Sequence, residues 1–227
     1  MTTPTTTKTI IAIIPVKRFE NSKSRLSTVL GLQDRVRLSG LMLEDTLATL
    51  GKCRSLAEIA VVSADERAGE IALRHGATIL SQAQDAGVNS AVAVADRYAV
   101  QEKHADATIV IPQDLPLLGA GDVDGICSAA SDRCIVICPS LRYDGTNLLL
   151  RMPPGVIPTS YDNNSYDSHI LSASAQGAAV RVIEQEHLMF DIDTQEDARQ
   201  LVQMDLREVV AKNVALFLKE KLLSLSL

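Results

Sequence analysis

The sequence predicts an α/β fold in which a mostly parallel sheet carries helices on both faces. Short runs of β-branched residues alternate with longer segments of helical period from Thr9 to Cys138. Regular alternation of this kind is typical of parallel strands joined by right-handed helical crossovers. One run, Thr108–Ile111, is almost entirely β-branched, as expected of a strand that helices cover on both sides.

The strands of this part of the chain are predicted wherever a short apolar run is rich in Val, Ile or Thr. They are expected at Thr9–Ile14, Glu58–Val62, Ala77–Leu80, Thr108–Ile111 and Arg133–Cys138. Each of the first four precedes a polar or loop-forming segment and then a stretch of helical spacing. This order places the helices between successive strands, as crossovers require.

The helices are predicted from apolar spacing and from capping residues. Apolar side chains recur every three to four positions over about residues 33–50, which indicates the first helix. Ser63-Ala-Asp-Glu66 has the pattern of a capping box, so the second helix is expected to begin at Ser63 and to end at Gly76. Two more helices are expected at Asn89–Lys103 and over about residues 120–131.

The second half of the chain has a less regular pattern. Prolines and glycines between residues 139 and 165 predict loops or a small excursion there. A helix at Ser165–Ala175 and a strand at Ala178–Ile183 are expected next. Thr194-Gln-Glu-Asp197 is a second capping box, which predicts the start of a long C-terminal helix reaching toward Leu223. We expect a single domain over residues 9–227, preceded by a disordered tail at residues 1–8.

The composition excludes several classes of function. Twenty-two basic and 28 acidic residues give a net charge of −6, which argues against a surface for duplex nucleic acid. Four Tyr, three Phe and no Trp leave little material for stacking on single strands. The longest apolar run, Ile10–Val16, is far shorter than the roughly 20 residues of a membrane span, and the N-terminus lacks the apolar centre of a signal peptide. A cytoplasmic protein without nucleic-acid or membrane partners is therefore expected.

Four cations follow the first predicted strand within nine residues: Lys17, Arg18, Lys23 and Arg25. Ligands of open α/β sheets bind beyond the carboxyl ends of the strands, so this loop is placed where phosphates are commonly held. The glycine pattern of a Walker loop is missing from it. The segment is either a solvated loop or a phosphate-binding loop that uses side-chain cations and backbone amides.

Three acidic residues are predicted at the same edge of the sheet. Asp114 follows the fourth strand in the turn Asp114-Leu-Pro116, and Asp191 and Asp193 flank Ile192 near the C-terminal helix. Side chains alternate along an extended chain, so Asp191 and Asp193 are expected to point to the same side. Two such carboxylates repel one another unless a cation lies between them, and Mg²⁺ prefers carboxylate and phosphate oxygens. Capping of the following helix by Asp193 or Thr194 is the alternative.

Taken in order, these and other segments resemble a known family. The segments are Ile14-Pro-Val-Lys17, Ser22-Lys-Ser-Arg-Leu26, Gly87-Val-Asn-Ser-Ala-Val92, Asp114-Leu-Pro116, Gly145-Thr-Asn147, Pro153-Pro154, Ser165-Tyr-Asp-Ser-His169 and Phe190-Asp-Ile-Asp193. Together they resemble the 2-phospho-L-lactate guanylyltransferase family, nucleotidyltransferases of the deazaflavin coenzyme F(420) pathway, over roughly residues 10–200.

The resemblance implies a Rossmann-like nucleotidyltransferase fold related to the molybdenum-cofactor guanylyltransferases. It implies a reaction that joins GTP and a small phosphorylated three-carbon acid, 2-phospho-L-lactate or phosphoenolpyruvate, into a guanylyl diphospho-acid with release of pyrophosphate. The implied cofactor is Mg²⁺.

The resemblance also implies roles for individual residues. Lys17, Arg25 and Asp114 would be catalytic. Lys17, Lys23, Arg25, Gly87 and Asn89 would bind the nucleotide, with the last two near the guanine. Asp114, Asp191 and Asp193 would bind Mg²⁺, while Thr146, Asn147, Asp162 and Ser165 would bind the acceptor.

One position departs from the family pattern. The family has a glycine three residues before the serine of the Ser165 motif, and this chain has Asp162 there. A carboxylate repels an anion where a glycine would let backbone amides approach it, so 2-phospho-L-lactate, phosphoenolpyruvate and 3-phosphoglycerate all stay open as the acceptor. His169 matches the family pattern, but a helical histidine that is simply packed is the alternative interpretation.

Other functions are compatible with the same residues. Another Mg²⁺-dependent nucleotidyltransferase of the molybdenum-cofactor or sugar-phosphate type, or a catalytically inactive nucleotide-binding module, would carry a similar fold. An assembly scaffold that uses the C-terminal helix is a third hypothesis. Apolar residues of that region could pack on the body of the protein or on a second subunit, and a homodimer is expected; they are Val202, Leu206, Val209, Val210 and Phe217.

Overall fold

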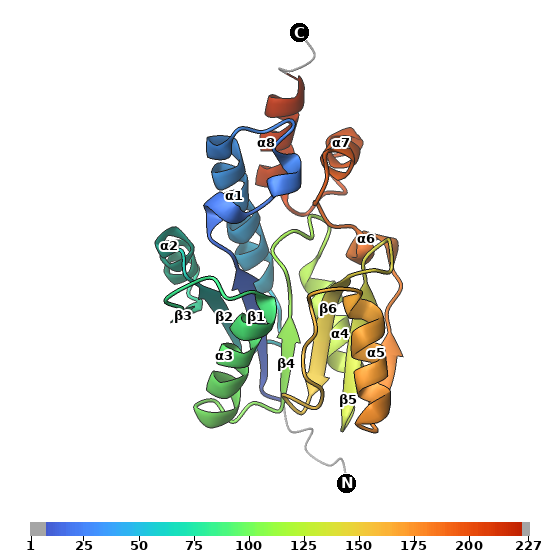
Figure 1. The fold of residues 1–227 in the computed structure, drawn as a ribbon. Helices are drawn as coiled ribbons and strands as arrows, with labels where there is room; N and C mark the ends of the chain where they lie inside the picture. Colours follow the sequence, from blue (N-terminus) through green and yellow to red (C-terminus); the bar gives the residue numbers. More distant parts are fainter. Residues whose placement is uncertain (1–7, 224–227) are drawn as a thin grey trace.

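A single seven-stranded sheet runs through the computed structural model, which describes residues 8–223 (Figure 1). The strand order across the sheet is β3-β2-β1-β4-β6-β5-β7. The strands are β1 Ile10–Val16, β2 Glu58–Ser63, β3 Thr78–Ser81, β4 Ala107–Val110, β5 Cys134–Pro139, β6 Thr146–Met152 and β7 Ala179–Val182. The predicted strands of the first half are therefore present, with bounds that differ by a few residues.

All strand pairs are parallel except the two that involve β6. β6 pairs antiparallel with both β4 and β5, so it runs against its neighbours in the middle of the second half of the sheet (Figure 1). The prediction of a mostly parallel sheet is confirmed. β6 itself was not predicted, since the prolines and glycines around it were interpreted as one loop region.

The error over residues 139–165 has a local cause. The strand Thr146–Met152 contains neither proline nor glycine, but Gly145 precedes it and Pro153 follows it. Six of its seven residues are buried, because the strand lies between β4 and β5 and is covered on both faces. Turn residues here mark the two ends of a short central strand and do not extend through it.

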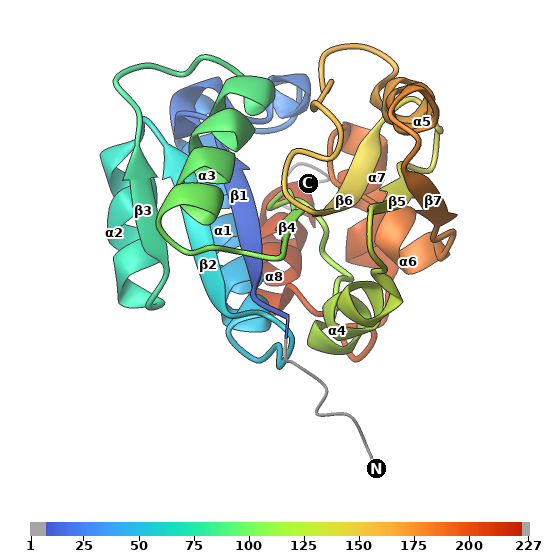
Figure 2. The same ribbon diagram turned by 90° about the horizontal axis from the view of Figure 1, so that it is seen from below.

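Helices cover both faces of the sheet, as predicted (Figure 2). α3 Val88–Gln101 and α5 Ser165–Ala175 share an apolar cluster with one face, through residues such as Val92 and Ala173. α1 Leu32–Leu50, α2 Glu66–Arg74 and α4 Ala120–Ala129 share a second cluster with the opposite face, through residues such as Leu47, Ile71 and Ile126. Alternate residues of β1 supply both clusters, which explains why this strand is apolar throughout.

The second helix begins two residues later than the capping-box pattern predicts. Asp65 is the N-cap of α2, and its side chain accepts a hydrogen bond from the backbone N–H of Arg67. Ser63 is still part of β2, where it pairs with Val16 and Ser81, and is not available as a cap. Gly76 follows the helix with a φ of +72°, as expected of a C-terminal glycine.

The C-terminal region forms two helices and not the one long helix that was predicted. α7 Gln195–Gln203 begins at the capping box of Thr194 and Asp197, which confirms that part of the prediction. α8 Lys212–Leu223 is separated from it by an irregular segment. The backbone N–H groups of Val210 and Ala211 donate to the carbonyl of Pro116, so this segment bonds to the loop after β4 and cannot continue a helix.

The apolar side chains of the C-terminal region pack largely on the chain's own body. Val209 and Phe217 are buried in a third cluster with Leu38 and Met42 of α1. Asp45 of α1 accepts hydrogen bonds from Asn213 and from the backbone of Val214, which fixes the start of α8 against α1. Val202 and Leu206 are partly buried against the same cluster, so four of the five residues pack on the body, while Val210 is exposed.

The N-terminal prediction falls partly outside the described residues, which exclude 1–7. Lys8, which was assigned to a disordered tail, has a defined position: its ammonium donates to the carbonyl of Ala130 over 2.6 Å. The following residue, Thr9, donates its backbone N–H to Asp106. Among residues 8–223 no helix combines the length and the apolar character needed to cross a bilayer.

Candidate active site

Polar side chains converge where β1, β4 and β6 meet at one edge of the sheet. β1 and β4 are neighbours and parallel, so the loops after Val16 and Val110 leave the sheet together. Because β6 is antiparallel to β4, its first residue, Thr146, lies at the same edge as the carboxyl end of β4. Two parallel strands thus contribute residues after they end, and the antiparallel strand contributes residues as it begins.

The loop after β1 carries the cluster of cations. It contains two short 3-10 turns, Phe19–Asn21 and Ser24–Leu26. Between them Lys23 has a φ of 52°, a left-handed conformation that is uncommon for residues other than glycine. Phe19 and Leu26 are buried on either side of it and hold the loop against the body. This backbone conformation turns the Lys23 side chain inward.

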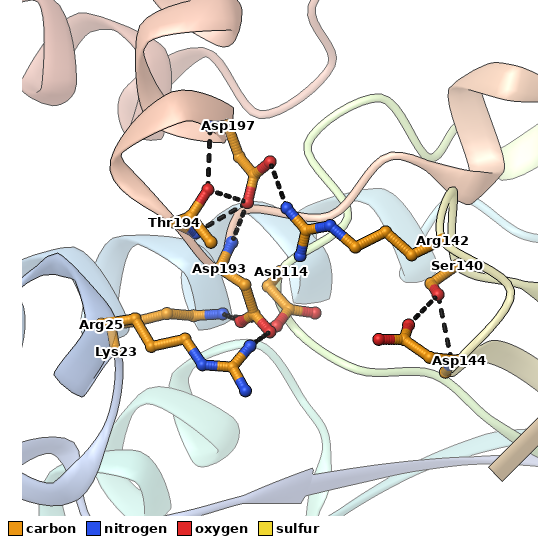
Figure 3. A network of polar contacts seen from close by, with 10 residues as sticks. Lys23, Arg25, Asp114, Ser140, Arg142, Asp144, Asp193, Thr194 and Asp197 are labelled. Carbon is orange, nitrogen blue, oxygen red and sulfur yellow. Dashed lines mark hydrogen bonds and ion pairs between the residues drawn. The ribbon is translucent and has the colours of Figure 1, made fainter. Parts of the chain in front are cut away.

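Lys23 lies between two carboxylates that are far apart in sequence (Figure 3). Its ammonium donates to Asp114 Oδ2 over 2.5 Å and to Asp193 Oδ1 over 2.8 Å. Only 7% of the Lys23 side chain is exposed, so solvent screens these two ion pairs weakly. Arg25, which is largely exposed, lies 3.6 Å from the other oxygen of Asp193.

A main-chain contact brings the two acidic segments together. The backbone N–H of Ile192 donates to the carbonyl of Asp114 over 3.1 Å. Phe190 and Ile192 are buried in the cluster beneath α1 and α7, whereas Asp191 and Asp193 line a cavity on the opposite side. The predicted alternation of side chains along this segment is confirmed.

The capping alternative for Asp193 does not hold. Thr194 is the N-cap of α7, and its hydroxyl accepts from the backbone N–H of Asp197. The Asp197 carboxylate in turn accepts from the backbone N–H groups of Asp193 and Thr194. The Asp193 carboxylate is left to pair with Lys23 and Arg25 (Figure 3).

The charges of the cluster shift one another's pKa values. The Lys23 ammonium, against the opposing effect of burial, lowers the pKa of Asp193. Burial works to lower the pKa of Lys23, but Asp114 and Asp193 outweigh it and raise that pKa. Burial, and after it the Asp114 and Asp193 carboxylates, raise the pKa of Asp191 to about 7. The charged form of Asp191 is therefore disfavoured by its burial and by the negative charge of its two neighbours.

The predicted magnesium site is not preformed in this arrangement. Within residues 8–223, no group of three or more His, Cys, Asp and Glu side chains is arranged to hold a metal ion. Lys23, which was expected to contact the nucleotide, instead occupies the position between Asp114 and Asp193. The predicted cation between Asp191 and Asp193 is therefore not what the structure contains: an ammonium of the same chain lies between Asp193 and Asp114.

Two adjoining cavities open at this edge. The β1-side cavity, of about 400 Å³, is lined by Lys17, Lys23, Arg25, Gln113 and Asp114 among others. The β6-side cavity has a volume of about 570 Å³. Its lining includes all four predicted acceptor residues and all three predicted metal ligands: Thr146, Asn147, Asp162, Ser165, Asp114, Asp191 and Asp193.

The two cavities share part of their walls. Arg25, Asp114, Thr146 and Asp193 line both of them. Lys17 lines the β1-side cavity and forms no ion pair with any of the other described residues. The structure thus brings Lys17, Arg25, Asp114 and the Asp191–Asp193 segment around one space.

The residues predicted to lie near the guanine have different surroundings. Asn89 Nδ2 donates to Asp162 over 3.1 Å, and Asn89 Oδ1 accepts from the backbone N–H of Tyr161. Asn89 therefore anchors the loop before α5, and a contact with guanine stays a prediction. Gly87, with a φ of +85°, precedes α3 in a conformation that favours glycine, and lines a small pocket together with Lys17.

The predicted acceptor residues form a hydrogen-bonded group. Thr146 Oγ1 lies 3.0 Å from His169 Nδ1 and accepts from the hydroxyl of Ser165. Asn147 donates to the carbonyl of Leu188 and so ties β6 to the segment that carries Asp191. Burial and the nearby Arg151 guanidinium lower the pKa of His169 to about 4, so this side chain is neutral at physiological pH.

Two lining residues were missed by the sequence analysis. Gln113 is nine-tenths buried in the β1-side cavity, and its side-chain oxygen has no hydrogen-bond partner among the described residues. Arg142 lines the β6-side cavity, 3.6 Å from Asp197 and more than half exposed. The signal for Gln113 was its position beside Asp114. Arg142 lies four residues before Thr146, at the start of a strand that was not predicted.

A mostly parallel sheet carries cations and carboxylates around two adjoining cavities at the edge where α/β proteins bind their ligands. Structural comparison supports this fold. A protein from Desulfovibrio desulfuricans superposes with a TM-score of 0.71 at 15% identity, over 93% of this chain and 97% of its own. A nucleotidyl transferase from Methanothermobacter thermautotrophicus superposes with a TM-score of 0.61 at 15% identity, over 85% and 95% of the two chains.

Residues 10–218 match the family model of the CofC-like guanylyl transferases, and the chain belongs to that family. A phosphoenolpyruvate guanylyltransferase from Rubrobacter xylanophilus is 36% identical over 85% of this chain and 93% of its own length. A 2-phospho-L-lactate guanylyltransferase from Methanothermobacter thermautotrophicus is 34% identical over 84% and 83%. The family, the nucleotidyltransferase activity and the Rossmann-like fold predicted from the sequence are confirmed.

Proposed function

We propose that this protein transfers the guanylyl group of GTP to the phosphate of a small phosphorylated three-carbon acid and releases pyrophosphate. The observation that carries the proposal is the pair of adjoining cavities with a shared wall. Lys17 and Arg25 line the β1-side cavity. Hydroxyl and amide groups, Arg142 and several carboxylates line the β6-side cavity, and the carboxylates of Asp114 and Asp193 lie at the junction of the two. This arrangement suits two anionic substrates that must meet at one phosphorus atom.

The acceptor needs little activation in this reaction. A phosphomonoester has a second pKa of roughly 6, so its oxygen is mostly deprotonated at neutral pH. The nucleophile attacks the α-phosphorus of GTP, the new P–O bond forms, and the bond to pyrophosphate breaks. His169, whose pKa is about 4 and whose ring is fully buried, is not required as a base.

The larger difficulty is to hold two polyanions in line. Lys17 and Arg25 offset the charge of the triphosphate and stabilise the negative charge that develops on the leaving pyrophosphate. Orientation of the acceptor oxygen opposite the leaving group supplies the remaining advantage. Tyr161 and Val88, which line both cavities, offer an uncharged wall at their junction.

We propose Mg²⁺ as the cofactor, bound by carboxylates that are not arranged around an ion among residues 8–223. Asp114, Asp191 and Asp193 supply carboxylate oxygens, the ligands that this ion prefers. Burial, and after it the two neighbouring carboxylates, raise the pKa of Asp191, and a cation close to it would offset the second of these effects. These residues would hold the ion in place of, or together with, the Lys23 ammonium. When bound, it supplies charge neutralisation for the phosphate oxygens.

The acceptor itself is proposed to be phosphoenolpyruvate or 2-phospho-L-lactate, the acids in the names of the related enzymes. Asp162, in place of the family glycine, accepts a hydrogen bond from Asn89, which disperses part of its charge. Arg142 adds a cation to the β6-side cavity that can pair with the acceptor's carboxylate. The same groups also suit 3-phosphoglycerate, so the experiment includes it.

The test is a matrix of substrates. The protein is incubated with Mg²⁺, one of GTP, ATP, CTP and UTP, and one of the three phospho-acids, and pyrophosphate release and product mass are measured. Release with GTP and one phospho-acid, together with the mass of the guanylyl diphospho-acid, supports the proposal. Release only with another triphosphate contradicts it in favour of a different nucleotidyltransferase. No release in any pairing favours a nucleotide-binding module.

We infer a cytoplasmic location and a homodimer as further parts of this proposal. The four free cysteines, Cys53, Cys127, Cys134 and Cys138, are compatible with a reducing compartment. Val210 and Leu216 leave apolar side chains exposed near and on α8. Light scattering after size exclusion tests the dimer, and a mass of one chain contradicts it.

A further inference from the structure

His169 occupies a fully buried position directly behind the acceptor residues. It lies on α5, with no exposed surface, and its ring contacts the Tyr161 ring edge-on at 5.0 Å between centroids. Nδ1 lies 3.0 Å from Thr146 Oγ1, and Nε2 accepts from the backbone N–H of Ser160 over 2.9 Å. The Arg151 guanidinium is the charged group that acts on the ring.

These contacts determine the tautomer of the imidazole. A backbone N–H can only donate, so Nε2 must be the nitrogen without a proton. A neutral imidazole then carries its proton on Nδ1, and that N–H donates to Thr146 Oγ1. The burial and the cationic neighbour that lower the pKa of His169 keep the ring in this neutral form.

The tautomer in turn determines what Thr146 can do. A hydroxyl oxygen has two acceptor positions and one hydrogen. In this structure the oxygen accepts from His169 and from the hydroxyl of Ser165, which occupies both positions. The hydroxyl hydrogen is left to donate, and Thr146 lines both cavities.

We propose that His169 is a positioning residue for the acceptor: through its Nδ1–H it turns the Thr146 hydroxyl into a donor that points at an anionic oxygen of the phospho-acid. This inference rests on the proposed function, because it assigns the residue that prepares the acceptor subsite of the same reaction. The second nitrogen holds the loop before α5 through Ser160, and Asn89 holds the next residue of that loop from α3.

Two polar substitutions of His169 distinguish the role of Nδ1 from that of Nε2. The side-chain amide of Asn reaches the position of Nδ1, so His169→Asn keeps a donor for Thr146 and loses the acceptor for Ser160. The amide of Gln reaches the position of Nε2, so His169→Gln keeps the acceptor for Ser160 and loses the donor. Each is made alone and with Thr146→Val, and His75→Asn, at an exposed position, is the control.

The expected result is a difference in KM for the acceptor. His169→Gln raises it about tenfold, the size of one lost hydrogen bond to a charged group, while KM for GTP stays at the wild-type value. His169→Asn leaves both near wild type. In the Thr146→Val background the two His169 variants have equal KM values, because the hydroxyl on which His169 acts is gone. Equal effects of Asn and Gln in the Thr146 background, or a difference that persists with Val, overturn the proposal.

A binding measurement keeps this test independent of turnover. Phosphoenolpyruvate, 2-phospho-L-lactate and 3-phosphoglycerate are titrated calorimetrically into the wild type and both His169 variants. Weaker binding in His169→Gln than in His169→Asn supports the positioning role even if no pyrophosphate is released and the proposed reaction is wrong. Failure of the wild type to bind any of the three acids overturns the role together with the acceptor assignment. Melting curves of all variants identify any loss of fold.

Discussion

The two halves of the sheet contribute to the site in opposite ways. In the β1–β4 half, all neighbouring strands are parallel, and the cavity-lining residues come from loops after the strands end. In the β5–β7 half, β6 runs antiparallel, and Thr146 and Asn147 line the cavity at the beginning of that strand. Ligand residues that follow a strand can therefore be recognised from the sequence in the first half. Thr146 and Asn147 begin a strand, so position after a strand does not reveal them.

The halves also differ in the chemistry they present. The β1–β4 half supplies Lys17, Lys23, Arg25 and Asp114, whose charges act over some distance and tolerate a range of geometry. The β5–β7 half supplies hydroxyls and amides, whose hydrogen bonds depend on direction, as well as charged groups such as Arg142, Asp144 and Asp162. We therefore expect substitutions in the first half to affect the chemical step most, and those in the second to affect the choice and binding of the acceptor.

The largest effect is expected for Asp114→Asn at the junction of the halves. Loss of this carboxylate removes a proposed metal ligand and one of the two partners of Lys23. We expect kcat to fall by about a thousandfold or more at matched Mg²⁺, with an unchanged circular dichroism spectrum. Asp191→Asn is expected to act in the same direction. Asp132→Asn, at an exposed site before β5, is the control, and wild-type rates in Asp114→Asn would remove the carboxylate from the mechanism.

Lys17→Ala tests the β1–β4 half alone. The ammonium lines the β1-side cavity, so its loss is expected to cost about 3 kcal/mol in kcat/KM for GTP, the scale of one stabilising donor. KM for the acceptor is expected to stay constant. Lys219→Ala, on the exposed side of α8, is the matched control. If Lys17→Ala instead raises the KM for the acceptor, the proposal that the β1–β4 half acts on the nucleotide and the β5–β7 half on the acceptor is wrong.

His169, in the β5–β7 half, is expected to make the free energy of unfolding of the protein fall in acid. The pKa of this side chain is about 4 in the folded protein, whereas an unperturbed histidine has a pKa of 6.5, so between these values the unfolded state binds more protons. The free energy of unfolding then rises with pH across this window, and about 3 kcal/mol is lost as pH falls from 6.5 to 4.

Urea denaturation measures this effect. The wild type and His169→Gln are compared at about pH 7.5 and about pH 4.5, so that the other titrating groups cancel between the proteins. The wild type is expected to lose more stability than the variant on acidification. Parallel pH dependence of the two proteins would show that His169 is not the source of the acid sensitivity.

The smallest effect is expected for Arg142→Ala. Arg142 is more than half exposed and pairs with Asp197 at 3.6 Å, so water screens much of its charge. We expect KM for the acceptor to rise about fivefold and KM for GTP to stay constant, in line with about 1 kcal/mol for an exposed pair. Arg207→Ala, on the exposed segment before α8, is the control. A larger change in the KM for GTP than in the KM for the acceptor would show that Arg142 acts on the nucleotide and not on the acceptor.

More of the fold than of the candidate site could be predicted from the sequence. Strong periodicity made β1, β2, β4 and the helices between them predictable. β6 was missed because seven residues between a glycine and two prolines carry no period of their own. The break between α7 and α8 was missed because it depends on hydrogen bonds to Pro116, which is distant in sequence.

The candidate site shows the same limit in its details. Charge and position after a strand singled out Asp114 and the four cations of the first loop, and alternation along an extended segment singled out Asp191 and Asp193. They did not reveal that Lys23 points inward, which follows from one left-handed residue and from the packing of Phe19 and Leu26. His169 was correctly seen as packed, yet its hydrogen bonds to Thr146 and Ser160 depend on β6 and on the loop before α5. Such partners are assembled by tertiary structure alone.

The salt bridges of Lys23 separate folding from metal loading. Many small metal-binding domains unfold under chelation because their ligands repel one another without the ion. Here the Lys23 ammonium pairs with both Asp114 and Asp193, so it offsets the repulsion between these two carboxylates without a metal ion. Excess EDTA is therefore expected to leave the melting temperature unchanged, and a marked drop would mean that the lysine does not suffice. A chain with this built-in ion pair would reach its final fold before any divalent ion binds.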